Sequence, residues 1–83
     1  MYYLYILECA DKTLYTGITT DLERRFKEHN SSSLGAKYTA ARRPVKLVYR
    51  EEFIDRASAS KQECVIKKLS RLEKIKLIKK PFS

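Results

Sequence analysis

An arginine and a histidine on one side of a predicted helix are the first residues whose types and spacing suggest chemistry. Leu22 and Phe26 are apolar and one helical turn apart, so they define the buried face of that helix. Arg25 and His29 follow at helical spacing and share this face. A half-buried arginine needs an anionic partner, either a carboxylate or a bound phosphate. The alternatives are that Arg25 extends over the sheet edge to solvent and that His29 interacts with the C-terminal helix dipole.

A lone carboxylate in a basic segment is the second candidate. Glu63 lies four residues after Ala59 and three before Ile66, so it borders the apolar stripe of another predicted helix. Magnesium is commonly held by one or two carboxylates together with waters and substrate phosphate, so one glutamate is enough. The alternative is an ordinary ion pair with Lys67 one turn later, worth only a few tenths of a kcal/mol.

Tyrosines form the third candidate group, with six in the chain and no tryptophan. Tyr5 and Tyr15 fall on neighbouring predicted strands, and Gly17 near the second permits close backbone approach. Side chains alternate between the two faces along a strand, and residues paired across two strands share a face. Tyr5 and Tyr15 therefore share a face only if the residue numbers of each cross-strand pair add up to an even number. A two-residue turn at Asp11 and Lys12 would separate them. A shared site therefore requires an odd-length loop or a bulge.

Positive charge is concentrated in the last third of the chain. The chain contains 18 lysines and arginines against 10 acidic residues, a net charge of +8. Residues 56–80 contain nine basic and two acidic residues and so carry +7 of that excess. This pattern fits a phosphate-binding surface or a solvated helical face equally well. A membrane-surface helix is less favoured because no bulky aromatic face accompanies the charge.

Length and composition exclude several classes of protein. The 83 residues predict one domain over residues 1–83 with a modest core. No apolar run approaches the ~20 residues that span a bilayer, and the N-terminus lacks the basic region of a signal peptide. Cys9 and Cys64 are too few for a disulfide scaffold and too far apart for a local zinc motif, so we expect both to be small buried residues. The sequence predicts a cytoplasmic protein with a polyanionic partner and no membrane association.

Six elements are predicted to position these residues. The predicted strands span residues 2–9, 13–17 and 45–53, and the predicted helices span 21–29, 56–69 and 70–80. Capping signals begin the helices: a box of Thr20 and Glu23, the lone Asp55, and a box of Ser70 and Glu73. Residues 30–44 read as an ordered loop that carries function. The order β-β-α-β-α-α predicts an α/β protein of the α+β type, a small three-stranded antiparallel sheet flanked by about three helices.

An ordered set of segments resembles the GIY-YIG nuclease superfamily. Tyr3-Leu4-Tyr5 occupies the place of the first triplet and Tyr15-Thr16-Gly17 that of the second. The likeness continues through residues 19–30, 35–39, 42–49 and 59–71, and is closest to the small stand-alone bacterial (YhbQ-like) members. The chain departs from the pattern at Tyr3, Leu4 and Thr16 but keeps both tyrosines. The asparagine found later in longer members has no clear counterpart here.

The resemblance implies the GIY-YIG fold and a metal-dependent endonuclease that hydrolyses DNA phosphodiester bonds in DNA repair or processing. In that picture Tyr5 or Tyr15 accepts a proton from water, Arg25 holds the phosphate, His29 orients water or relays the proton, and Glu63 binds Mg²⁺ or Mn²⁺. The partners would be DNA, branched and single-stranded forms included, and a protein that supplies specificity. The alternatives are a non-catalytic nucleic-acid-binding module of the same fold and a subunit that docks an acidic protein. The predicted nucleic-acid-binding residues are Lys37, Arg42, Arg43, Lys67 and Arg71.

Overall fold

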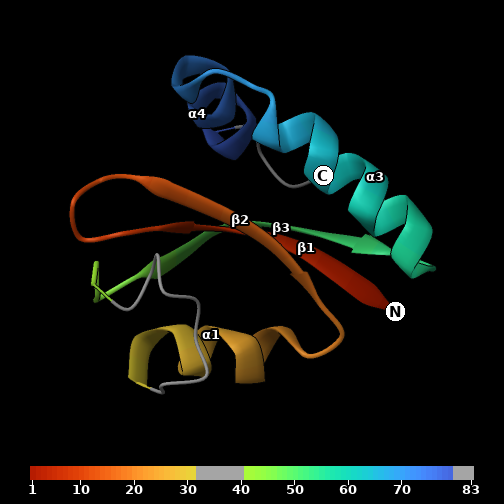
Figure 1. Cartoon of the computed structure of the whole chain (residues 1–83), viewed down its shortest axis with the longest axis horizontal. Coiled ribbons are helices and arrows are strands. Elements are labelled where there is room, and N and C mark those ends of the chain that lie inside the picture. The colour runs from red at the N-terminus through yellow and green to blue at the C-terminus, as the bar shows by residue number, and fades with distance from the viewer. Residues whose placement is uncertain (32–40, 80–83) are drawn as a thin grey trace.

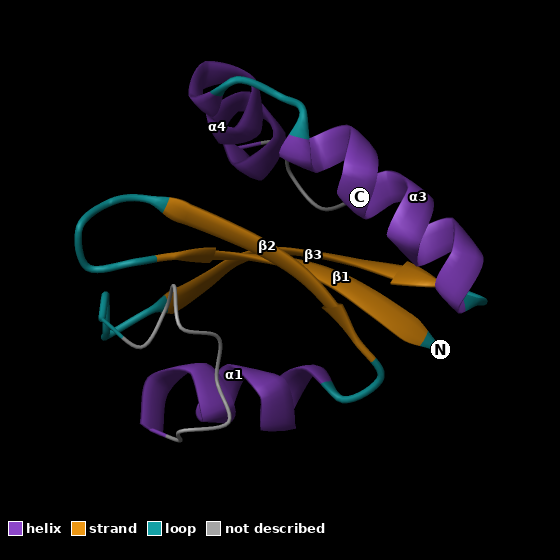
Figure 2. Ribbon diagram, viewed as in Figure 1, coloured by secondary structure: helices purple, strands orange, loops and turns teal. Residues whose placement is uncertain are grey.

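A computed structural model of the chain describes residues 1–31 and 41–79. Its three strands form one antiparallel sheet, as predicted, and they lie in the order β2-β1-β3. Helix α1 covers one face of this sheet, and α3 and α4 cover the other (Figures 1 and 2). The described helices include none long and apolar enough to cross a membrane. The elements in chain order are β1 (Tyr2–Glu8), β2 (Leu14–Thr19), α1 (Leu22–Ser31), β3 (Lys46–Phe53), α3 (Arg56–Lys67) and α4 (Arg71–Lys79).

The hairpin between β1 and β2 has the odd-length loop that a shared tyrosine site requires. The backbone N–H of Cys9 donates to the carbonyl oxygen of Thr13 over 2.8 Å, which leaves residues 10–12 as a three-residue loop. Lys12 takes the left-handed conformation, with φ 69°, that usually falls to glycine in such loops. The resulting register pairs Tyr5 with Gly17 and Leu7 with Tyr15. Both tyrosines therefore point to the α1 face of the sheet.

Strand β1 is buried on both of its faces. On the α1 side, Tyr5, Leu7 and Cys9 form a buried cluster with Val45. On the other side, Leu4 and Ile6 pack against Ile66 of α3. A central strand covered by helices on both faces explains why the N-terminal run of the sequence is continuously apolar rather than alternating.

The N-terminus of α1 differs from the prediction. Asp21, rather than Thr20, caps the helix, because its Oδ1 accepts the backbone N–H of Arg24 at 3.1 Å. The Thr19 hydroxyl accepts the backbone N–H of Asp21 at 3.1 Å and fixes the entry of the chain. The predicted box at Thr20 was therefore wrong. An aspartate at this position adds a negative charge that favours the helix dipole, and the helix starts at Leu22.

The other two helix starts are confirmed. Asp55 Oδ1 accepts the backbone N–H of Ser58 at 2.7 Å. Ser70 and Glu73 form both bonds of a reciprocal capping box, at 3.2 and 2.9 Å.

The two cysteines differ in environment. Cys9 is buried as expected, whereas Cys64 is exposed, so the prediction for Cys64 was wrong. Cys64 precedes the buried Ile66 by two residues on α3. Two residues turn a helix by about 200°, which directs Cys64 to the outer surface.

Candidate active site

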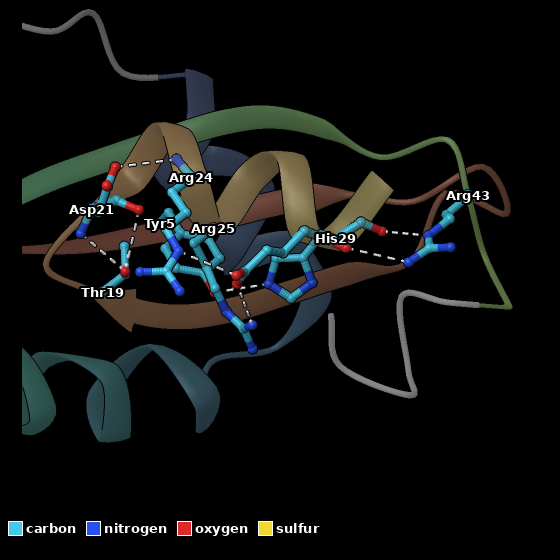
Figure 3. A network of polar contacts seen from close by, with 8 residues as sticks. Tyr5, Thr19, Asp21, Arg24, Arg25, His29 and Arg43 are labelled. Atoms are coloured by element: carbon cyan, nitrogen blue, oxygen red, sulfur yellow. Dashed lines mark hydrogen bonds and ion pairs between the residues drawn. The ribbon is translucent and has the colours of Figure 1, made fainter. Parts of the chain in front are cut away.

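Two tyrosines from the sheet and the histidine of α1 converge on the α1 face. The hydroxyl of Tyr5 hydrogen-bonds Nε2 of His29 at 2.9 Å (Figure 3). The ring of Tyr15 lies 5.1 Å from that of His29 and 6.5 Å from that of Tyr5, between ring centroids. We call Tyr5, Tyr15, His29 and the adjoining Arg25 the tyrosine–histidine cluster. The even register of β1 and β2 and the inward face of α1 bring its members together.

Burial keeps the central pair of this cluster uncharged at neutral pH. His29 has no exposed surface, so desolvation, helped by the positive charge of Arg25, lowers the pKa of His29 to about 4. Desolvation raises the pKa of Tyr5 to about 12, although its hydrogen bond from Arg25 opposes the shift. A protonated tyrosine and a neutral imidazole therefore share this hydrogen bond. The prediction that His29 faces inward is confirmed, while its catalytic role stays a prediction.

Arg25 and Arg24 occupy different environments, as the helical spacing predicts. The side chain of Arg25 is 28% exposed and that of Arg24 is 73% exposed. Arg25 Nη1 donates to Glu28 Oε1 at 3.0 Å, and the positive charge of Arg25 acts on the Tyr5 hydroxyl, whose pKa it lowers against the larger effect of burial. The anionic partner that a half-buried arginine requires is therefore a carboxylate in this structure.

Glu28 was missed by the sequence analysis. Its carboxylate bridges Arg25 and Arg24, whose Nε lies 3.3 Å from Oε2. The hydrogen bond from Arg25 holds the pKa of Glu28 below its usual value. The signal was present in the spacing, because Glu28 follows the two arginines by three and four residues on one helix.

Glu63 lies on α3, on the other side of the sheet, and its role as a metal ligand is untested. Its side chain is 21% exposed and lies 3.5 Å from Lys67 Nζ, so the ordinary ion pair is present. Its negative charge nevertheless contributes to the raised pKa of Tyr5, which places it within electrostatic reach of the cluster.

The donor set fits only one kind of metal site. Within residues 1–31 and 41–79 no three side chains of the metal-binding types gather into a group. A site made by protein ligands alone is thus not formed by the described residues. A single carboxylate that shares a hard cation with waters and a phosphate fits the described residues, and the assignment of Glu63 to that role stays a prediction.

Two of the predicted nucleic-acid-binding arginines make contacts within the fold. Arg42 Nε donates to Asp11 Oδ2 at 3.0 Å and so ties the hairpin loop to the segment before β3. Arg43 Nε donates to the carbonyl oxygen of His29 at 2.6 Å and Arg43 Nη2 to that of Glu28 at 3.2 Å (Figure 3). These bonds satisfy carbonyl groups in the last turns of α1.

Two of the remaining predicted binding residues lie on α3 and α4, on the face of the sheet opposite α1. Lys67 and Arg71 are exposed on α3 and α4. Arg71 and Lys74 line a small pocket of about 180 Å³ beside the β1–β2 hairpin. Lys37 lies outside the described residues. Binding of nucleic acid by any of these side chains stays a prediction.

Asn30 is a second residue that the sequence analysis missed. Its Nδ2 donates to the carbonyl oxygen of Val45 at 3.1 Å, and its Oδ1 accepts the backbone N–H of Val45 at 2.7 Å. The sequence analysis ended the helix at residue 29, whereas α1 continues to Ser31. The paired bonds fix the C-terminal turn of α1, and with it His29, to the start of β3.

Comparisons with known proteins find a matching family model and similar relatives. The protein-family model described as "GIY-YIG catalytic domain" matches residues 1–76. A UPF0213 protein of Desulfotalea psychrophila is 59% identical over 78 residues, covering 94% of this chain and 71% of the relative. A UPF0213 protein of Syntrophus aciditrophicus is 58% identical over 77 residues, covering 93% and 88%.

Solved structures show the same fold. The solution NMR structure of a UPF0213 protein from Bacillus halodurans is 47% identical with a TM-score of 0.61, and the match covers 94% of this chain and 83% of that one. A protein from E. faecalis, also solved by NMR, is 46% identical with a TM-score of 0.66, covering 94% and 82%. The chain therefore belongs to the GIY-YIG family, next to the small UPF0213 proteins of bacteria.

Proposed function

We propose that this chain is a divalent-metal-dependent endonuclease that hydrolyses DNA phosphodiester bonds in the cytoplasm, in DNA repair or processing. One observation carries the proposal. The Tyr5 hydroxyl hydrogen-bonds Nε2 of His29, and the positive charge of Arg25 acts on both groups, so a proton path and a fixed positive charge lie in one cluster. Membership of a family named for its catalytic domain supports it.

Arg25 is the residue we assign to the phosphate. A guanidinium has five N–H donors in a planar fork, a geometry that matches the oxygens of a phosphate. Because the side chain is only 28% exposed, its charge is poorly screened by water. That charge would stabilise the negative charge that builds up on the phosphate in the transition state.

Tyr15 is the tyrosine we assign to the attacking water. Tyr5 is 2% exposed and stays protonated at neutral pH because its pKa is raised to about 12, whereas Tyr15 is only half-buried. Tyr15 would accept the proton from water while Tyr5 and neutral His29 hold the adjoining hydrogen bonds in place.

Glu63 is the residue we assign to Mg²⁺ or Mn²⁺. When bound, the cation would act as a Lewis acid towards the phosphate and stabilise the leaving oxygen. Glu63 would have to leave its ion pair with Lys67, which is exposed and weak. Lys67 would then be released to contact the DNA backbone.

Cleavage of supercoiled plasmid, a four-way DNA junction and a single-stranded oligonucleotide with Mg²⁺ or with EDTA tests the proposal. Arg25→Ala and Glu63→Ala should each reduce cleavage about 100-fold or more. Arg24→Ala and Glu23→Ala, which remove exposed charges from α1, are the matched controls and should leave the rate within about twofold.

Binding without cleavage would overturn the proposal and support a non-catalytic nucleic-acid-binding module. In that case DNA affinity should fall steeply with salt concentration in wild type and in the Glu63→Ala variant alike. Cleavage that survives both EDTA and Glu63→Ala would contradict the assigned metal dependence.

A further inference from the structure

A second concave site lies between α1 and β3, apart from the tyrosine–histidine cluster. This α1–β3 groove has a volume of about 490 Å³, within the usual range of binding sites. None of the four side chains of the cluster lines it. Its apolar part is formed by side chains from the sheet and from α1, namely Tyr3, Leu22, Phe26 and Leu47. Leu47 is 38% exposed there, which is unusual for a large apolar side chain facing a helix.

The charge of the groove is opposite to that of the chain. Asp21, Glu23 and Glu52 line it together with Arg50, which leaves a net negative charge in a protein of net charge +8. A phosphate backbone would be repelled by this lining. A ligand with positive charges and apolar groups matches it.

The groove runs beside an outer edge of the described sheet. Within the described part of the chain, β3 is an outer strand whose partner is β1. It has eight residues, Lys46–Phe53, with no proline or glycine, and its register with β1 shifts once, between the Ile6–Tyr49 and Leu7–Leu47 pairs. Such an edge presents backbone N–H and C=O groups that an extended segment can pair with. Leu47, Arg50 and Glu52 of this strand line the groove, so a strand added to β3 would direct alternate side chains towards it.

We propose that the edge of β3 and the α1–β3 groove bind an extended segment of a partner protein whose groove-facing side chains are apolar and basic. A second copy of this chain fits less well. Antiparallel pairing of two β3 strands would place a second set of Asp21, Glu23 and Glu52 on the same side of the joined sheet, where like charges repel. This inference does not depend on nuclease activity.

Amide resonances of ¹⁵N-labelled protein, followed during a peptide titration, test the proposal. The probe is a nine-residue peptide with threonine at alternate positions and leucine and lysine in turn at the others. Its matched control carries glutamate in place of lysine. The lysine peptide should shift the resonances of β3 and of the N-terminal half of α1, and the glutamate peptide should not. Two further lysine peptides carry N-methyl groups, one on the odd-numbered amides and the other on the even-numbered amides. Only one of these two sets faces the edge of β3, so one of the two peptides should lose binding because its pairing N–H groups are blocked.

Charge reversal in the protein provides a second readout. Glu52→Lys should weaken binding of the lysine peptide roughly fivefold or more, because an attraction becomes a repulsion. Glu8→Lys makes the same change on β1 outside the groove and should alter affinity less than about twofold.

Four outcomes would overturn the proposal. The first is equal binding of the lysine and glutamate peptides, and the second is binding that survives N-methylation of either set of amides. The third is displacement of the lysine peptide by oligothymidine. The fourth is a change in the amide resonances of β3 with protein concentration in the absence of peptide. The third would indicate nucleic acid as the occupant and the fourth a second copy.

Discussion

The hydroxyl oxygen of Tyr5 lies 2.5 Å from the point where a β-carbon would stand on Gly17, its cross-strand partner. The ring carbon that carries the hydroxyl lies 2.7 Å from the same point. Carbon atoms in proteins do not approach so closely, so the ring occupies space that only glycine leaves open. Tyr5 reaches His29 from this position, and Gly17 therefore determines the geometry of the cluster.

Gly17→Ala should move the Tyr5 ring and break its hydrogen bond to His29. Glycine in a strand interior usually costs about 0.5–1 kcal/mol relative to alanine, so without a clash this substitution would stabilise the protein. Because of the clash, we expect a loss of about 1–3 kcal/mol in the free energy of unfolding. Denaturant unfolding of the wild type and the variant measures the difference.

The double variant Tyr5→Leu/Gly17→Ala is the control for that clash. A shorter side chain at residue 5 leaves room for the new methyl group, so Gly17→Ala should cost much less in this background. Equal costs in the two backgrounds would mean that the tyrosine ring is not what requires glycine.

His29 should titrate far below the ordinary histidine range. It is the sole histidine of the chain, so its ring resonances can be assigned directly. We expect a midpoint pKa of about 4 instead of 6.5. Arg25→Ala should raise this pKa because it removes a nearby positive charge, whereas Arg24→Ala should leave it nearly unchanged. A midpoint near 6.5 would contradict the buried environment.

The same shift makes stability depend on pH. The unfolded chain binds the histidine proton near pH 6.5 and the folded chain only near pH 4. His29 therefore contributes fully above pH 6.5, and its contribution, on the order of 3 kcal/mol, is lost as the pH falls towards 4. Tyr5 acts in the other direction, since its contribution is lost as the pH rises from 10 to about 12.

Sequence patterns predicted the fold and the inward residues because they follow from regular periodicities. Helical spacing placed Arg25 and His29 on the buried face of α1, and strand alternation linked Tyr5 and Tyr15 to the parity of the hairpin. The odd length of the loop could not be predicted from the sequence, because Lys12 adopts a left-handed conformation that is usually found for glycine.

Other features depended on choices among nearly equivalent residues. Thr20 and Asp21 are both good capping residues, and the bond from the Thr19 hydroxyl to the Asp21 backbone favours the second. The pairing of Glu28 with both arginines, in preference to solvent, follows from how deeply each side chain lies in the assembled structure. Neither burial nor such a choice is encoded in spacing alone.

Glu28→Gln should separate DNA binding from cleavage. The change removes a negative charge beside Arg24 and Arg25, so DNA affinity should rise, with about one more counterion released on binding. Glutamine holds the Arg25 guanidinium less firmly, so cleavage of bound DNA should slow by about tenfold. Single-turnover cleavage and binding at several salt concentrations measure the two effects. Glu23→Gln removes an exposed carboxylate from the same helix and should change binding alone.

Arg43→Ala should reduce stability more than it reduces DNA binding. The guanidinium donates to the carbonyl oxygens of His29 and Glu28 near the end of α1, so its loss leaves these groups without their partner. We expect a cost of about 1 kcal/mol and a fall in Tm of about 4–8 °C. The salt dependence of DNA binding should stay nearly the same, because the side chain faces the helix end. If the Tm stays the same and the salt dependence of DNA affinity instead falls by about one released counterion, Arg43 contacts the DNA backbone, as the sequence alone had suggested.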